Sequence, residues 1–171
     1  QAEAVESYGA VLALAPRHAR ATASLISALR RAGDWEGLAE ILAVEVAHLS
    51  GAQAVPVYAE LASLYLDKLQ AAGPGEAALR RIVALDRSEV AARRRLAGLL
   101  AERGQRPEAI ELLMAAARNL APEEAAAALR QAAQLAEALD DVMLELRLML
   151  RAHALLPAKG EDLMRLAESL Y

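Results

Sequence analysis

Apolar residues recur three and four positions apart along this chain, and short groups of turn-forming residues interrupt them at regular intervals. The segments between the turns have roughly 11 to 18 residues, a length and period that are typical of amphipathic helices and not of strands. The pattern predicts an all-α chain of about ten antiparallel helices joined by short turns. In one expected hairpin, the apolar positions are Leu25, Leu29 and Ala32 on the first helix and Leu38, Leu42 and Val46 on the second.

The interrupting groups are rich in Gly, Pro, Asp and Ser, which end helices or begin the next one. We expect the Gly-Pro-Gly group at 73–75 to form a lengthened turn and Ser88 to mark a helix start. Pro122, which two glutamates follow, predicts another helix start. Asp140 and Asp141 occupy a turn position, so we interpret them as helix-capping residues and not as paired catalytic carboxylates.

Equivalent helix starts lie near residues 19, 55, 90, 126 and 160, so the successive spacings are 36, 35, 36 and 34 residues. A nearly constant period of this length is typical of helical-repeat solenoids, in which each hairpin buries its faces against its neighbours. We therefore predict a right-handed α-solenoid of about five helix-turn-helix repeats, forming a single array over residues 1–171. Since the chain starts and ends within a repeat, we expect it to be a segment of a longer protein.

The helices expected at the two ends of the chain carry apolar residues that no further repeat covers. Repeat arrays normally end in a polar capping face, so we expect end-to-end self-association through these terminal helices. The apolar residues concerned are Tyr8, Val11, Leu12 and Leu14 near the start, and Leu163, Leu166 and Leu170 near the end.

The repeat resembles the tetratricopeptide repeat (TPR), a unit of 34 residues that forms two antiparallel helices. In that family a large and a small residue sit together in the first helix with an aromatic residue three positions on, as Leu61, Ala62 and Tyr65 do here. The turn at 33–35 has the matching sequence Gly-Asp-Trp. Further positions that fit the pattern are Leu96, Ala97, Ala109, Leu113, Ala116, Ala133, Ala136, Ala152 and Pro157.

Composition narrows the classes of function. Aromatic residues make up 3% of the chain, and Phe and Cys are absent, so we expect no sheet, disulfide or thiolate metal site. A net charge of −4 argues against general attraction to nucleic acid, and no apolar run is long enough for a transmembrane helix. The sequence shown contains no targeting segment and leaves the compartment open, with the cytoplasm slightly favoured.

Patterns that carry catalytic chemistry do not occur in the sequence. His18, His48 and His153 lie in different hairpins without metal-binding spacing, and no glycine-rich phosphate loop is found. We therefore predict no catalytic residue, no metal site and no cofactor. We interpret the four methionines as core or groove residues. We interpret Gly98, which lies mid-helix, as a point of close helix approach, with open space for a ligand as the alternative.

The TPR resemblance implies that the first helices of the hairpins line a concave groove, into which the second, fifth, ninth and twelfth positions of each helix point. Over the first four such helices, these positions hold four arginines and a single acid, Glu137, although the chain is negatively charged. Alternatively, arginine simply decorates the helices, because nearly all of the 19 basic residues are arginine. The candidate groove residues are Arg20, Ser27, Arg30, Ser63, Leu66, Arg94, Gly98, Arg130 and Gln134.

The resemblance implies a non-enzymatic protein–protein interaction module, a scaffold or assembly factor that binds a protein or peptide in its groove. Because an arginine can grip a carboxylate with two parallel hydrogen bonds, we expect an acidic partner, and neither nucleic acid nor membrane insertion. Ala23 and Ser27 stand where the family's chaperone-tail clamp carries Lys and Asn, so chaperone tails are not expected. The alternative function is a regulatory or sensor repeat domain of a larger bacterial signalling or transcription-regulator protein.

Overall fold

The structure is a computed structural model, and it describes residues 19–156 of the 171-residue chain. Within that range the chain forms helices and turns without a strand, which confirms the predicted all-α fold. A 3-10 turn, η1 (Gly51–Gln53), and a π turn, η2 (Leu64–Lys68), accompany the α-helices. The α-helices are α2 (Ala19–Ala32), α3 (Trp35–Val46), α4 (Val55–Ser63), α5 (Ala72–Leu85), α6 (Val90–Glu102), α7 (Arg106–Ala117), α8 (Pro122–Glu137) and α9 (Val142–Leu155).

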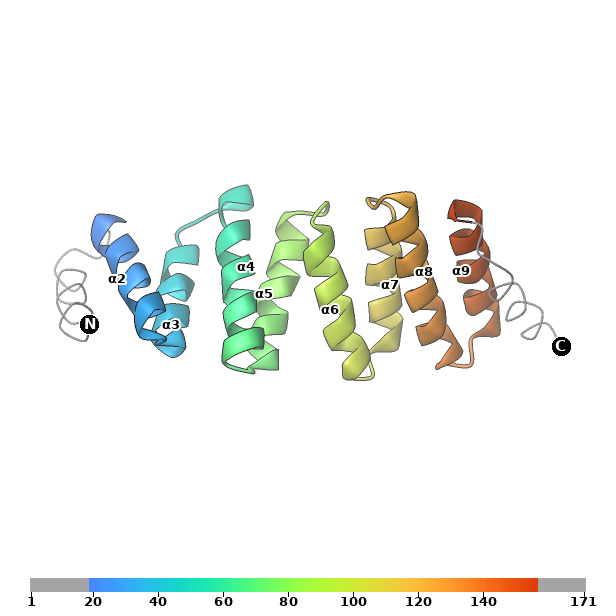
Figure 1. The fold of residues 1–171 in the computed structure, drawn as a ribbon, viewed down its shortest axis with the longest axis horizontal. Helices are drawn as coiled ribbons and strands as arrows, with labels where there is room; N and C mark the ends of the chain where they lie inside the picture. The colour runs from blue at the N-terminus through green and yellow to red at the C-terminus, as the bar shows by residue number, and fades with distance from the viewer. Residues whose placement is uncertain (1–18, 157–171) are drawn as a thin grey trace. The chain divides into compact units, whose positions relative to one another are not determined.

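The chain divides into two compact units, an N-terminal unit of residues 1–85 and a C-terminal unit of residues 86–171. The described part of the N-terminal unit contains α2 to α5, and that of the C-terminal unit contains α6 to α9. Within each unit, helices that follow one another in the chain pack together and run antiparallel (Figure 1). This is the predicted helix-turn-helix packing.

Several predictions concern residues beyond this range. The terminal apolar residues near 8–14 and 163–170, and the repeat expected near residue 160, lie outside the described residues. The right-handed twist, the number of repeats and the continuity of a single array remain predictions.

The first hairpin of the N-terminal unit, α2 and α3, has the turn that its sequence predicts. The chain leaves α2 through Gly33, whose φ of 72° is a conformation that glycine adopts without steric cost. Asp34 then caps α3, because its carboxylate accepts a hydrogen bond of 3.0 Å from the Gly37 amide. Of the apolar positions predicted for this hairpin, Ala32 is exposed, while Leu25, Leu29, Leu38, Leu42 and Val46 are buried.

The second hairpin departs from the predicted register, because α4 ends in the π turn η2. A π turn inserts one residue into a helix, so it rotates the side chains that follow relative to an α-helical count. The chain then turns at Gln70, which has a positive φ of 51°, and α5 begins at Ala72. The group at 73–75 therefore lies in the first turn of α5, and the prediction of a lengthened turn there is wrong. Pro74 is accommodated because amides in the first turn have no intrahelical acceptor.

The C-terminal unit packs largely through alanine and leucine. Small alanine side chains let neighbouring helices approach closely, while leucines fill the space between them. The most deeply buried apolar residues of this unit include most of the positions that carry the TPR-like pattern. Among these deeply buried residues are Leu96, Ala97, Leu100, Ala109, Leu113, Ala116, Ala126, Ala132, Ala136, Leu148 and Ala152.

The sequence predicted the starts of two helices in the C-terminal unit, and one of these predictions is confirmed. Helix α8 begins at Pro122 as predicted, one turn before the repeat start expected near 126, because proline fits the first helical position. Helix α6 follows Glu89, and Ser88 does not cap it. Instead, the Ser88 hydroxyl donates a hydrogen bond of 2.6 Å to Asp86, in the turn that precedes the helix.

Candidate functional site

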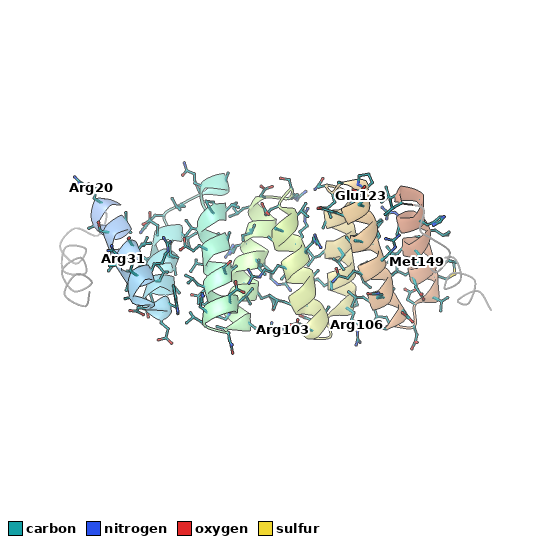
Figure 2. All side chains as sticks on the ribbon, viewed as in Figure 1. Arg20, Arg31, Arg103, Arg106, Glu123 and Met149 are labelled. Carbon is teal, nitrogen blue, oxygen red and sulfur yellow. The ribbon has the colours of Figure 1, made fainter. Side chains whose placement is uncertain are left out.

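The nine candidate groove residues divide between the two units. Five belong to the N-terminal unit, where α2 carries the exposed Arg20, Ser27 and Arg30. Arg20 lies in the first turn of α2 and extends away from it (Figure 2). Arg30 lies in the last turn of α2, and its guanidinium contacts the Glu60 carboxylate of α4 at 2.5 Å. The charge of Arg30 is therefore compensated within the protein, which weakens the expected basic character of this surface.

The π turn changes the position of Leu66, which an α-helical count assigned to the groove floor. Leu66 is half-buried, and its side chain packs directly against the α-carbon of Gly75 in α5. The contact is so close that a Cβ atom on Gly75 would overlap the Leu66 side chain. Ser63, the last residue of α4, is also half-buried and is engaged in an interaction of its own. Leu66 therefore contributes to packing in the N-terminal unit.

The other four candidates lie on two helices of the C-terminal unit. Arg94 and Gly98 are one turn apart on α6, and Arg130 and Gln134 are one turn apart on α8. Both helices pack against α7. Arg94 and Gln134 are exposed, whereas Gly98 and Arg130 are half-buried, and Arg130 already takes part in an interaction within the protein. We refer to these four residues as the Arg94 surface.

Gly98 lies on this surface with open space around it. A Cβ atom built on Gly98 would meet no atom of a neighbouring element within 4 Å. The interpretation of Gly98 as a point of close helix approach is therefore wrong, and the alternative of open space agrees with the structure. A glycine in a helix interior costs about 1 kcal/mol relative to alanine, so packing does not explain the residue.

Arg93, the neighbour of Arg94, has a different environment that the sequence reasoning missed. It is 7% exposed, and among residues 19–156 it is the one charged side chain that is buried. Hydrogen bonds from the Ser88 side chain and amide hold the pKa of the Asp86 carboxyl below its ordinary value, and the positive charge of Arg93 lowers it further. The spacing of Arg93 to Leu96 and Leu100, three and seven residues, was the signal that it shares their buried face.

Trp35, the sole tryptophan of the chain, is the first residue of α3. It lies half-buried beside the turn at Gly33. The Lys68 ammonium group of η2 lies 5.2 Å from the centre of its ring, which is a cation–π distance. This contact connects the first hairpin of the N-terminal unit to the end of α4.

One of the three methionines among residues 19–156 differs from its predicted role. Met114 and Met149 are half-buried, as gap-filling residues are expected to be, and Figure 2 shows Met149 on α9. Met143, in contrast, is 68% exposed in the first turn of α9. Its assignment as a core or groove residue is therefore wrong. Met164 lies outside the described residues.

Acidic and histidine side chains of residues 19–156 lie in caps, turns and on helix surfaces. Asp141 caps α9 by accepting a hydrogen bond of 3.0 Å from the Leu144 amide, which confirms its capping role. His48 is exposed on the turn after α3 and His153 is half-buried on α9, while His18 lies outside the described residues. No group of three His, Asp or Glu side chains in this range is arranged to hold a metal ion. None of its helices has the length and apolar character needed to cross a bilayer.

Comparison with solved structures shows the fold. YrrB, described as a TPR protein with an unusual peptide-binding site, superposes with a TM-score of 0.60 and 17% identity, over 94% of this chain and 80% of that one. MamA gives a TM-score of 0.59 and 14% identity, over 85% and 82% of the two chains. The N-terminal domain of stress-induced protein-1 from C. elegans gives 0.59 and 15%, over 71% of this chain and all of that one.

No protein-family model matches the sequence, and no curated protein matches it. At these low identities the structural likeness establishes the fold alone. The chain thus has the TPR-like helical-repeat fold that its sequence predicted.

Proposed function

We propose that this chain is a non-enzymatic protein-interaction module, a scaffold or assembly factor that binds a segment of another protein on the first helices of its hairpins. The proposal is supported by the fold that it shares with YrrB, a protein described by its peptide-binding site. The binding site that we favour is the Arg94 surface of the C-terminal unit.

The observation that carries this choice is the open space at Gly98. A mid-helix glycine lowers stability without improving packing here, since a Cβ atom would meet nothing within 4 Å. A bare stretch of helix backbone leaves room for the main chain or a bulky side chain of a bound segment. Arg94 is exposed one turn before Gly98 on α6, and Gln134 is exposed on α8.

The chemistry of these side chains favours a partner that carries carboxylates. An arginine offers a planar fork of donors to a carboxylate, and a glutamine can both donate to and accept from a peptide backbone. In the N-terminal unit the Arg30 charge is already balanced by Glu60, so we assign the acid preference to the Arg94 surface. Binding should weaken as salt is added, because exposed charges are screened over about 8 Å at physiological ionic strength.

A quantitative pull-down with three versions of the whole chain tests the proposal. The Arg94→Ala/Gln134→Ala double variant removes the two exposed polar side chains of the surface, and Arg118→Ala removes an exposed arginine at the C-cap of α7 in the same unit. We expect a partner that the parent and Arg118→Ala retain equally and that the double variant loses. The contact of Arg94 with a carboxylate contributes about 1.5 to 3 kcal/mol and that of Gln134 with a backbone about 0.5 to 1.5 kcal/mol, so the purified partner should bind the double variant at least tenfold more weakly. Equal capture by all three chains would contradict the assignment.

A further inference from the structure

Helix α9 exposes apolar residues on the side opposite its buried face. It packs through Leu148 and Ala152, which are buried. Met143 and Leu150 are 68% and 54% exposed, and together with Arg147 they form a stripe at i, i+4 and i+7 spacing along the opposite side. Arg151, one residue beyond Leu150, is also exposed. We refer to Met143, Arg147, Leu150 and Arg151 as the outer face of α9.

Other second helices of the hairpins carry different residues at the same positions. The N-cap residues Asp34, Gln105 and Asp141 define a common register for α3, α7 and α9. We compare the positions two, six and nine residues after each cap. In α9 these are Met143, Arg147 and Leu150. The same positions hold Glu36, Glu40 and Ala43 in α3, and Pro107, Glu111 and Met114 in α7. Six residues after the cap, α9 therefore has a base where α3 and α7 both have a glutamate, and two residues after the cap it has Met143 where α3 has Glu36.

The shape and charge of this face indicate what covers it. A stripe that follows one helix over about 11 Å, at 1.5 Å per residue, is matched by the apolar stripe of another helix lying along it. Arg147 and Arg151 border the apolar residues, so acidic residues beside that stripe would complement them. A second copy that paired through the same face would bring its own arginines against these two, and like charges in an interface are unfavourable.

We propose that the outer face of α9 is a second docking surface, separate from the Arg94 surface, and that it binds an amphipathic helix of a partner protein with acidic residues beside its apolar stripe. Met143 and Leu150 supply the apolar contact, and the two arginines select the charge of the partner. This surface assigns a role to the exposed Met143, which packing within the protein leaves unexplained.

The probe is a synthetic amphipathic helix of about 15 to 20 residues with leucines on one side and flanking glutamates, compared with a peptide whose glutamates are replaced by lysines. We expect the whole chain to bind the acidic peptide at least tenfold more tightly than the basic one at low salt. Leu150→Glu should weaken acidic-peptide binding by tenfold or more. The matched control is Val44→Glu on α3, which changes an apolar residue that is 61% exposed and should leave binding unchanged. Equal binding of both peptides, or full binding by Leu150→Glu, would overturn the proposal.

Thiol labelling separates the possible occupants, since the natural chain has no cysteine. In the free protein, Met143→Cys should react with an alkylating reagent as fast as Val44→Cys, and the acidic peptide should protect Met143→Cys alone. Protection in the dilute free chain would show that another segment of this chain covers the face. Protection that rises with protein concentration would assign it to a second copy. Either result would overturn the proposal.

Discussion

Replacing Gly98 by alanine should stabilise the protein, although most single substitutions destabilise the protein in which they are made. Gly98 lies inside α6, and an added Cβ atom meets no neighbouring element within 4 Å. The substitution therefore gains helix propensity, about 0.5 to 1 kcal/mol, without a steric cost. Part of that gain comes from the reduced conformational freedom of the unfolded chain.

The assay is urea unfolding followed by circular dichroism. With a urea dependence of about 1 to 3 kcal/mol per molar, the midpoint should rise by roughly 0.2 to 1 M. Gly75→Ala is the matched control, because its Cβ atom would overlap Leu66, so the same change should destabilise the protein by about 1 kcal/mol. An unchanged or lower midpoint for Gly98→Ala would mean that the space at Gly98 is filled, and would refute the argument for a ligand there.

Four further experiments test the packing, the caps and the charges. Leu113→Ala should lower the free energy of unfolding by about 2 to 5 kcal/mol in urea titrations, because this leucine is fully buried in α7. Asp141→Ala should cost about 1 kcal/mol by removing the α9 cap, and Asp141→Asn should restore most of the loss in the same titration. The pKa of Asp86 is lowered from its ordinary value of 3.8, so its stabilisation is present above that pH and is lost as pH falls through the lower folded-state pKa. Asp86→Asn should therefore flatten the loss of stability below about pH 4 in an acid titration, and an unchanged profile would show that this carboxylate does not contribute. A double-mutant cycle on Arg30→Ala and Glu60→Ala should give a coupling below about 1 kcal/mol that salt reduces, since both side chains are partly exposed.

The sequence predicted the fold closely because local signals and packing agree in most of the chain. Alternating spacings of three and four residues fix which faces are buried, and Gly33 with Asp34 ends one helix and caps the next. The leucine and alanine positions that carry the TPR-like pattern in the described part of the C-terminal unit are buried. In these regions the tertiary packing and the local helix and turn preferences favour the same structure.

The candidate site could be predicted only in part, since it depends on register and on neighbouring side chains. The π turn at 64–68 breaks the α-helical count, so Leu66 packs on Gly75 and does not keep its expected place. Arg30 pairs with a glutamate thirty residues away, which no spacing rule indicates. Gly98 was identified, but its open surroundings are a tertiary property, and a mid-helix glycine fits close packing equally well in sequence.

The exposure of Met143 likewise depends on tertiary structure. Its apolar spacing within α9 is compatible with burial, and only the position of the packing face, at Leu148 and Ala152, shows that it points outward. The buried Arg93 is the converse case, because charge suggests exposure while its register with Leu96 places it in the core.

The most direct test of the proposed function is the affinity of the purified partner for Gly98→Phe, measured by calorimetry on the whole chain. Phenylalanine would occupy the open space beside Arg94 without changing any charge. The matched control, Asn119→Phe, places the same side chain at an exposed, uncharged position in the turn after α7 of the same unit. We predict that Gly98→Phe keeps the helical circular dichroism of the parent and binds at least tenfold more weakly, while Asn119→Phe binds as the parent does. A folded Gly98→Phe chain with parental affinity would contradict binding at the Arg94 surface.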